Sequence, residues 1–241
     1  MKLKLLEIKD NVPEDTVSFK LERRDKKGNF IKYKPGQFIT LDLDTKKDEK
    51  GPQRCLTLSS SPSESFLMFT TKIRDSLFKQ KLESISPGSD LSVKPPSGKF
   101  TFPEDKTKDV IFISGGIGVT PFRSMLKYSV DMNMPTNILM FDSNKSPDKI
   151  LFRDEFDQWQ KMNKNLKIVH TLTEDVPNRW KGEVGRIDEK MLRKYISSGK
   201  IDNSIFYICG PPKMVENVKK LLKEKLEVSE KNIVVEQFTG Y

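Results

Sequence analysis

The stretch that decides the fold reads Val110-Ile111-Phe112-Ile113-Ser114-Gly115-Gly116-Ile117-Gly118-Val119-Thr120-Pro121-Phe122-Arg123-Ser124-Met125-Leu126. A β-branched apolar run ends at three glycines, and an amphipathic segment follows, with Thr120 predicted as the N-cap and Pro121 at the first helical position. The pattern predicts a strand, a tight turn and a helix. Glycines let the backbone approach a ligand, and the N–H groups that open a helix favour an anion. We therefore expect Gly115, Gly116 and Gly118 to hold a nucleotide phosphate, against the alternative of a turn that binds nothing.

The remainder of the second half alternates between strand and helix patterns. Strands are predicted at residues 110–114, 137–141, 166–172, 204–209 and 233–235, and helices at 122–131, 152–162, 189–197 and 214–226. This alternation predicts an α/β domain over residues 104–241, with a five-stranded parallel sheet covered on both faces. A ligand crevice is then expected at the carboxyl ends of the strands.

The first half contains short alternating segments and hardly any helix. Strands are predicted at residues 3–8, 16–21, 38–43, 54–59, 66–72 and 91–94, separated by turns rich in glycine, proline and charge. Their spacing predicts a six-stranded antiparallel β-barrel over residues 1–103. One helix is expected at residues 77–83, with Ser76 as its N-cap.

Composition narrows the classes of partner and cofactor. The chain carries 43 Lys and Arg against 34 Asp and Glu, a net charge of +9, but charges of both signs are spread throughout. No basic tract is interleaved with aromatics, which argues against nucleic acid and leaves an acidic redox protein as a partner. Cys55 and Cys209 are the only cysteines and His170 the only histidine, which excludes a structural zinc or an all-cysteine iron–sulfur cluster within this chain. No signal peptide or membrane span is evident, so we expect a cytoplasmic protein with an organic redox cofactor.

Polar residues on the barrel strands predict a ligand surface. Arg54 precedes Cys55, Leu56 and Thr57, and guanidinium matches phosphate while hydroxyls can bond a heteroaromatic ring. A second strand edge, with Thr71 and Lys72, runs into the expected helix start at Ser76. The alternatives are a surface salt bridge for Arg54 and solvated turns for the neighbouring serines.

Two loops of the parallel sheet are further candidates. Asp142 offers an acid for an adenosine ribose, whereas Ser143, Asn144 and Lys145 could cradle a 2′-phosphate and favour NADPH slightly. The loop therefore does not decide between NADH and NADPH, and Asp142 can equally be a turn residue. The second loop is Cys209-Gly210-Pro211-Pro212. Cys209 could lie beside a reactive ring or be a small buried residue, and His170 is expected to be structural.

Three of these patches, in their order along the chain, resemble the ferredoxin–NADP reductase superfamily of flavoproteins. They are Arg54-x-x-Thr57-x-x-Ser60, Gly115 to Pro121, and Cys209 to Pro212. Nearly the whole chain shares the resemblance, including Pro35-Gly36-Gln37-Phe38 and the last residues, Glu236 to Tyr241. The resemblance implies a flavin barrel followed by an NAD(P) domain, with hydride passing from nicotinamide to flavin at the domain interface.

The same resemblance assigns roles to residues. Arg54 and Ser76 would bind the flavin pyrophosphate, Thr57 would face flavin N5, and Thr71 and Lys72 would line the ring. The glycine turn with Thr120 and Pro121 would hold the nicotinamide nucleotide. Cys209, Gly210 and Pro211 would flank the nicotinamide, with Glu236 nearby as an acid. Tyr241 resembles a terminal aromatic that covers the flavin and moves aside for nicotinamide.

Leu56 departs from the family, which usually has tyrosine or phenylalanine there to stack on the flavin. Ser76 and the aromatic tail favour FAD over the shorter FMN. The implied function is a flavin-dependent NAD(P)H oxidoreductase that passes single electrons to a separate carrier such as ferredoxin or flavodoxin. The alternatives are a reductase component of an oxygenase, a free-flavin reductase, and a non-catalytic flavin-holding subunit of a larger complex.

Overall fold

The computed structural model describes residues 1–10, 13, 15–25, 27–105 and 107–239, so the predicted role of Tyr241 lies outside the described residues. The chain divides into two compact units. The first contains Met1–Phe102 and Thr120–Tyr128, and the second contains Pro103–Val119 and Ser129–Tyr241. The segment 120–128, which follows the glycine turn, therefore groups with the barrel sequence rather than with the sheet it leaves.

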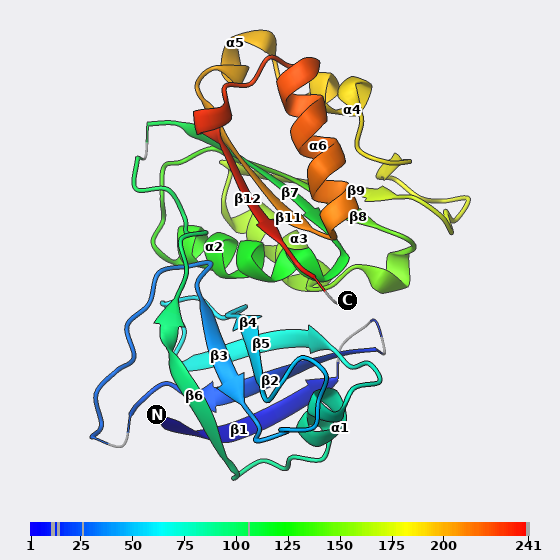
Figure 1. Cartoon of the computed structure of the whole chain (residues 1–241). Coiled ribbons are helices and arrows are strands. Elements are labelled where there is room, and N and C mark those ends of the chain that lie inside the picture. Colours follow the sequence, from blue (N-terminus) through cyan, green and yellow to red (C-terminus); the bar gives the residue numbers. More distant parts are fainter. Residues whose placement is uncertain (11–12, 14, 26, 106, 240–241) are drawn as a thin grey trace. The chain divides into compact units, whose positions relative to one another are not determined.

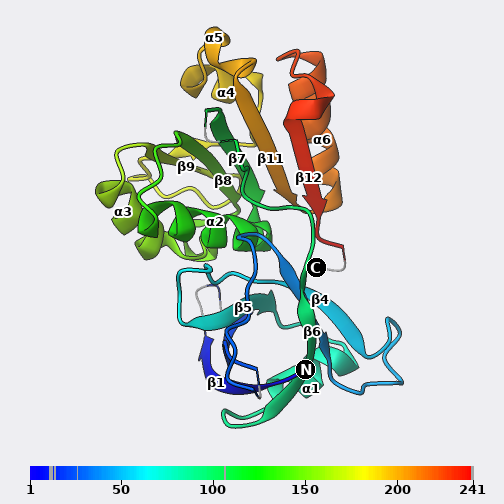
Figure 2. The same cartoon turned by 90° about the vertical axis from the view of Figure 1, so that its left-hand side faces the viewer.

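The first unit contains the predicted antiparallel sheet. Its strands are β1 (Lys2–Asp10), β2 (Thr16–Glu22), β3 (Phe38–Asp42), β4 (Gln53–Thr57), β5 (Phe66–Lys72) and β6 (Asp90–Ser97), in the order β4-β3-β6-β1-β2-β5 (Figure 1). An isolated antiparallel bridge joins Leu58, just after β4, to Phe69 on β5. Because β4 and β5 are the edge strands, this bridge closes the sheet on itself, and Figure 2 shows the strands curled around a common interior.

Apolar residues on the inward faces of these strands fill the barrel. Phe19 and Phe69 lie opposite each other on β2 and β5, and their rings stack with centroids 5.0 Å apart. The helix α1 (Leu77–Glu83) adds Phe78 and Leu82 to this core. The side chain of Ser76 accepts a hydrogen bond from the Lys79 amide, so the predicted helix and its N-cap are confirmed.

The second unit contains a parallel sheet of six strands, one more than predicted. They are β7 (Asp109–Gly115), β8 (Ile138–Asn144), β9 (Leu166–Leu172), β10 (Glu183–Val184), β11 (Ser204–Gly210) and β12 (Ile233–Gln237), in the order β10-β9-β8-β7-β11-β12. The additional strand, β10, has two residues and pairs with the end of β9. A segment this short carries no detectable alternation, which is why the sequence pattern missed it.

Helices follow the strands as expected for this alternation. They are α2 (Thr120–Asp131), α3 (Arg153–Met162), α4 (Glu189–Tyr195), α5 (Ser198–Ile201) and α6 (Pro212–Glu224), with 3-10 turns η1 (Gly116–Val119), η2 (Pro147–Lys149) and η3 (Glu230–Asn232). Apolar residues of α4 and α6 share one core with β7 and β11. Figure 2 shows α3 and α6 on opposite faces of the parallel sheet, so both faces are covered.

Candidate functional site

Arg54 lies on β4 with its guanidinium held by several acceptors. It forms an ion pair with Asp48 and donates to the carbonyl oxygens of Gly51 at 2.7 Å and Lys50 at 3.1 Å. The guanidinium also lies over the ring of Phe78, 4.8 Å from its centroid. The side chain is only 17% exposed. Its orientation is therefore fixed by contacts from both the loop before β4 and the first turn of α1.

The next three residues of β4 differ in exposure. Cys55 is exposed, and its sulfur lies 3.7 Å from the Thr40 hydroxyl. Leu56 is 3% exposed and belongs to the barrel core. Thr57, at the end of the strand, is 8% exposed. Leu56 is thus packed as an aliphatic core residue at the position where the family usually has a stacking aromatic.

The third predicted patch joins β5 to α1. Thr71 is fully buried and accepts a hydrogen bond from the ammonium of Lys79, while Lys72 forms a 2.9 Å ion pair with Asp15. Lys79 is itself 8% exposed. Sequence reasoning missed this lysine, although a lysine three positions after an N-cap, between the apolar residues Phe78 and Leu82, is a detectable anomaly.

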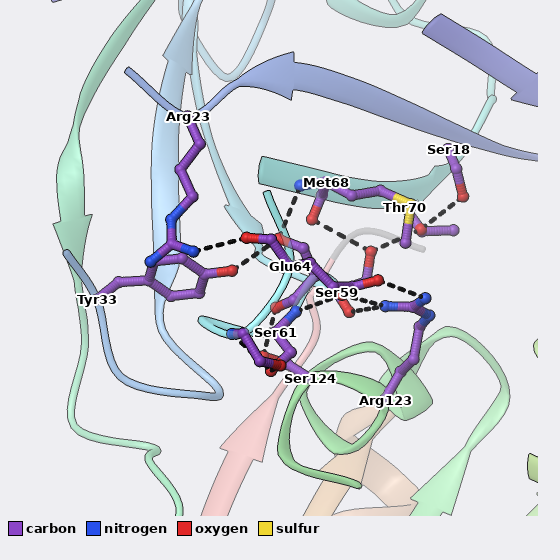
Figure 3. A network of polar contacts seen from close by, with 12 residues as sticks. Ser18, Arg23, Tyr33, Ser59, Ser61, Glu64, Met68, Thr70, Arg123 and Ser124 are labelled. Carbon is purple, nitrogen blue, oxygen red and sulfur yellow. Dashed lines mark hydrogen bonds and ion pairs between the residues drawn. The ribbon is translucent and has the colours of Figure 1, made fainter. Parts of the chain in front are cut away.

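A buried polar network fixes the loop that follows β4 (Figure 3). Arg123 donates to the Ser59 carbonyl oxygen at 2.7 Å and to the Glu64 carboxylate at 3.0 Å, and Ser124 donates to the Ser60 carbonyl oxygen at 2.5 Å. The Ser60 hydroxyl lies 2.9 Å from the Tyr33 hydroxyl. Ser60, the last residue of the family motif, is therefore engaged in holding the loop.

Each of the three glycines in the turn is required for a different physical reason. A Cβ on Gly115 would clash with the Met214 sulfur, and a Cβ on Gly118 would clash with the Cys209 backbone. Gly116 has φ +54° and nothing within 4 Å of a Cβ position, so its requirement is conformational. Gly115 and Gly118 thus allow the glycine turn to lie directly against the segment that contains Cys209, Gly210 and Pro211.

The start of α2 differs from the prediction. The 3-10 turn η1 occupies residues 116–119 and continues without a break into α2, so Thr120 is the first residue of the helix and not its N-cap. Thr120 is 1% exposed and Pro121 is also buried. A 3-10 turn was not recognisable because glycines at the end of a strand predict an open turn equally well.

One row of polar residues crosses the parallel sheet near the carboxyl ends of its strands. The register aligns His170 on β9 with Asp142, Asp142 with Ser114, Ser114 with Cys209, and Cys209 with Glu236 on β12. Laterally aligned residues of parallel strands point to the same face. The structure thereby brings Cys209 and Glu236, which are far apart in the sequence, next to each other.

Glu236 and Cys209 form the less satisfied end of this row. Burial raises the pKa of the Glu236 carboxyl to about 7. Its Oε2 atom is buried and has no hydrogen-bond partner among the residues that the structure describes. Cys209 is fully buried, and burial together with the neighbouring Glu236 raises the pKa of its thiol. At neutral pH the pair therefore combines a neutral thiol with a carboxyl near its midpoint.

The opposite end of the row is well satisfied. Asp142 is 1% exposed and accepts hydrogen bonds from the Ser114 hydroxyl at 2.7 Å and the Asn144 amide at 2.8 Å, and His170 Nδ1 lies 3.1 Å away. His170 Nε2 has no partner within the described part of the chain. These contacts extend β8 through Asn144, a stretch predicted as a loop. The Asp142 carboxylate is thus directed into the sheet and is not available to a ribose.

The other nucleotide residues lie at the ends of strands. Ser143 is half-buried on β8, Asn144 is 6% exposed, and Lys145 is exposed with a 2.9 Å ion pair to Glu174. Gly210 ends β11 and Pro211 is the N-cap of α6. Of the predicted phosphate cradle, Lys145 is the side chain that extends into solvent.

The surroundings of Asp48 test whether the barrel fits a flavin pyrophosphate. Its carboxylate accepts from the amides of Phe78 at 2.8 Å and Lys50 at 3.0 Å in addition to Arg54, and its side chain is 3% exposed. These backbone N–H groups, above all that of Phe78, lower the pKa of Asp48. A phosphate oxygen is bound by the same kinds of donor. The donor set therefore fits an anionic group, with the Asp48 carboxylate as its stand-in.

No described helix is long and apolar enough to cross a membrane. Within the described ranges, no three His, Cys, Asp or Glu side chains are grouped as ligands around a metal ion would be.

Comparison with known proteins identifies the family of the two domains. The oxidoreductase FAD-binding domain model matches residues 3–102, and the oxidoreductase NAD-binding domain model matches residues 112–220. The glycine betaine monooxygenase reductase subunit of Pseudomonas aeruginosa is 32% identical over 199 residues, which are 79% of this chain and 52% of that protein. The chain thus spans about half the length of the curated relatives it matches.

Solved structures agree on the fold. The FAD/NAD-binding domain of nitric oxide dioxygenase from Vibrio cholerae has a TM-score of 0.83 at 20% identity and covers 98% of both chains. Ferredoxin–NADP+ reductase from Plasmodium falciparum has a TM-score of 0.76 at 20% identity, covering 98% of this chain and 95% of that one. Because the two domain models account for most of the chain in the order that the fold requires, the chain belongs to the ferredoxin–NADP reductase-like flavoprotein oxidoreductases, which use FAD and NAD(P)H.

Proposed function

We propose that this oxidoreductase takes hydride from NADPH or NADH and passes electrons one at a time to a carrier outside these 241 residues, such as a ferredoxin or flavodoxin. The observation that supports the proposal is the pairing of Cys209 with Glu236 at the carboxyl end of a parallel sheet, where the glycine turn packs directly against the Cys209 segment. The net charge of +9 favours an acidic carrier.

When bound, FAD would supply the redox chemistry, which is acceptance of a hydride from a nicotinamide and release of single electrons. The chain supplies position and electrostatics around that chemistry. Arg54 and Ser76 would bind the flavin pyrophosphate, Thr57 would offer a hydroxyl to the flavin ring, and Cys209 would flank the nicotinamide. Glu236, with a pKa of about 7, can hold a proton beside the nicotinamide at neutral pH.

An anaerobic titration tests this function. The purified protein is expected to be yellow, to bleach on addition of NADPH or NADH, and to recover its colour when an acidic one-electron carrier is added. A protein that binds FAD but is not bleached by either nucleotide would be a flavin-holding subunit. Reduction without electron delivery to any carrier, but with release of reduced flavin, would indicate a free-flavin reductase.

A reductase component of an oxygenase is the second candidate. Its support is the similarity to the glycine betaine monooxygenase reductase subunit, of which this chain spans 52%. The two candidates differ in the terminal acceptor. Electron delivery to the oxygenase component of such a system, measured as reductase-dependent substrate oxidation, would favour the second candidate over a general carrier reductase.

A further inference from the structure

The first turns of α2 pack against the barrel unit at three places. The ring of Phe122 lies against that of Phe100, which follows β6, with the ring centroids 5.8 Å apart. A Cβ on Gly36, close to the start of β3, would clash with the Met125 side chain, so the backbone there approaches α2 closely. The third place is the loop after β4, whose carbonyl oxygens accept hydrogen bonds from polar side chains of α2. Three contacts with different parts of the barrel sequence thus fix the start of this helix.

The polar contact is buried and includes an ion pair. The guanidinium of Arg123 is 4% exposed and donates to the Ser59 carbonyl oxygen at 2.7 Å and to the two carboxylate oxygens of Glu64 at 3.0 and 3.3 Å (Figure 3). A planar guanidinium that is held by several acceptors has a fixed orientation. Removal of one partner from a buried ion pair is strongly unfavourable, because the other charge is left uncompensated. The loop and the start of α2 are therefore expected to move together.

Arg123 joins two segments that each adjoin a predicted ligand site. Ser59 is the second residue after Thr57, the hydroxyl residue proposed to face the flavin. Arg123 is the fourth residue of α2, and η1, which includes the glycine turn, continues into that helix without a break. Gly118 of this turn lies against the Cys209 backbone. A restraint on Thr57 can therefore reach the glycine turn through the contacts of Arg123 and one continuous piece of helix.

We propose that Arg123 is a positioning residue that couples the binding of FAD to the binding of the nicotinamide nucleotide. The inference rests on the proposed function, because both ligands enter it. FAD in contact with Thr57 restricts the loop after β4, and Arg123 transmits this restriction to the start of α2 and to the glycine turn. When the first ligand has ordered a shared element, the second ligand loses less conformational entropy on binding, and its affinity increases. The coupling is reciprocal, so the nucleotide strengthens FAD binding by the same factor.

Arg23 provides a matched control, because it holds the same loop from another segment. It follows β2 and donates to the carbonyl oxygens of Pro62 and Glu64, both at 2.6 Å. Figure 3 shows the side chains of Arg23 and Arg123 reaching the loop from different directions. Arg23→Met and Arg123→Met each remove a guanidinium from the loop. The first substitution removes a link to β2, and the second removes a link to α2.

The test measures the affinity of the full chain for ADP-ribose and 2′-phospho-ADP-ribose by isothermal titration, without flavin and with FAD bound. These probes are NAD+ and NADP+ without the nicotinamide, so they cannot stack on the flavin and they report coupling through the protein. The wild type should bind its preferred probe about fivefold or more tightly when FAD is bound. In Arg123→Met the two affinities should agree within about twofold. Arg23→Met should keep the wild-type ratio.

A second variant tests the same link with a smaller change. Ser124→Ala removes the 2.5 Å hydrogen bond from the Ser124 hydroxyl to the Ser60 carbonyl oxygen, and it leaves the ion pair of Arg123 in place. The ratio of the probe affinities with and without FAD should therefore decrease, but less than in Arg123→Met. If Arg123→Met does not fold, because the largely buried Glu64 loses its cation, Ser124→Ala decides the question. An unchanged ratio in this variant would then contradict the proposal.

Three further results would overturn the proposal. The first is an equal affinity of the wild type for the probe with and without FAD. The second is a wild-type ratio in Arg123→Met. The third is an equal loss of the ratio in Arg123→Met and Arg23→Met, because the order of the loop, and not its link to α2, would then set the affinity. Failure of the wild type to bind FAD, or to bind either probe, is a separate outcome that contradicts the oxidoreductase function itself.

Discussion

Buried carboxyl groups have opposite pKa shifts in two regions of the molecule. These regions are the charged cluster at Arg54 in the barrel and the polar row on the parallel sheet. In the barrel, Asp48 is surrounded by donors and its pKa is lowered. At the β12 end of the row, Glu236 is desolvated without a compensating donor among the described residues, and its pKa is raised to about 7. The same functional group is thus a fixed anion in one region and a titrating acid in the other, because donors and not burial alone set its charge.

The row itself repeats the contrast between satisfied and unsatisfied acids. Asp142, two strands from Cys209, has three partners, whereas Glu236 has a buried oxygen without one in the described structure. A satisfied acid rigidifies a sheet, and an unsatisfied acid is available to a ligand. Substitution of each acid in turn tests this difference.

Replacement of the satisfied acid should have the largest effect on stability. Asp142→Ala removes the common acceptor of Ser114, Asn144 and His170 and leaves buried polar groups without a partner. We expect the free energy of unfolding to fall by about 3–5 kcal/mol, measured by urea denaturation. Asp148→Ala, at an exposed aspartate with 61% of its side chain accessible, is the matched control and should change stability little. A loss below about 1 kcal/mol for Asp142→Ala would contradict the satisfied-acid interpretation.

Replacement of the unsatisfied acid should instead change the pH dependence of stability. Because folding raises the pKa of Glu236 from 4.5 to about 7, the folded state holds the proton more tightly. That contribution is fully present below pH 4.5 and is lost as the pH rises through 7. It amounts to about 3 kcal/mol. Glu236→Gln should therefore gain stability over the wild type between pH 5 and pH 8 in urea denaturation. Glu224→Gln, at an exposed glutamate, is the control and should follow the wild-type pH profile of stability. If Glu236→Gln also followed that profile, the Glu236 carboxyl would not be desolvated in the folded protein.

Sequence reasoning identified those elements of the fold whose signals are local. The pattern of apolar residues, together with the turn and capping residues, predicted a strand at 166–172 and a helix at 77–83. These bounds are those of β9 and α1. The end of β8 was missed because Asp142 and Asn144 are polar and were interpreted as a loop. What keeps them in a strand is Ser114 on β7 and His170 on β9, and such partners from other strands are not visible in a linear pattern.

The site shows the same limit. Arg54, the glycine turn and the Cys209 segment carry recognisable motifs, and the structure places each on the expected element. Lys79 and Arg123 carry none. Charged residues in amphipathic helices are normally assigned to solvent. The apolar neighbours of Lys79 were its one sequence signal of burial, and only the three-dimensional positions of Thr71 and Glu64 show which groups these two residues bind.

On the barrel side, Arg54→Ala tests whether the donors around Asp48 serve a phosphate. Loss of the guanidinium should weaken FAD binding by about 1.5–3 kcal/mol, as for a hydrogen bond to a charged group. The measurement is the flavin-to-protein absorbance ratio after dialysis, with Arg179→Ala, at an exposed arginine, as the control. Unchanged flavin occupancy in Arg54→Ala would mean that Arg54 serves only its ion pair with Asp48.

The smallest effect is expected at Lys145, which sharpens the contrast because this site is open to solvent. Its side chain is 70% exposed and its ion pair with Glu174, 54% exposed, is screened by water. If Lys145 meets the 2′-phosphate, Lys145→Ala should weaken NADP+ binding by no more than about 1 kcal/mol, or about fivefold, and leave NAD+ binding unchanged.

Glu174→Ala is the matched variant, because it removes the competing acid and leaves Lys145 in place. It should strengthen NADP+ binding slightly and again leave NAD+ binding unchanged, both measured by isothermal titration at low ionic strength. Opposite shifts for the two variants would assign the 2′-phosphate to this exposed pair. Equal shifts in the affinity for both nucleotides would show that the pair changes the general electrostatic potential of the surface and does not contact the 2′-phosphate. Because Asn144 and Asp142 are buried, the end of β8 would then offer no phosphate contact.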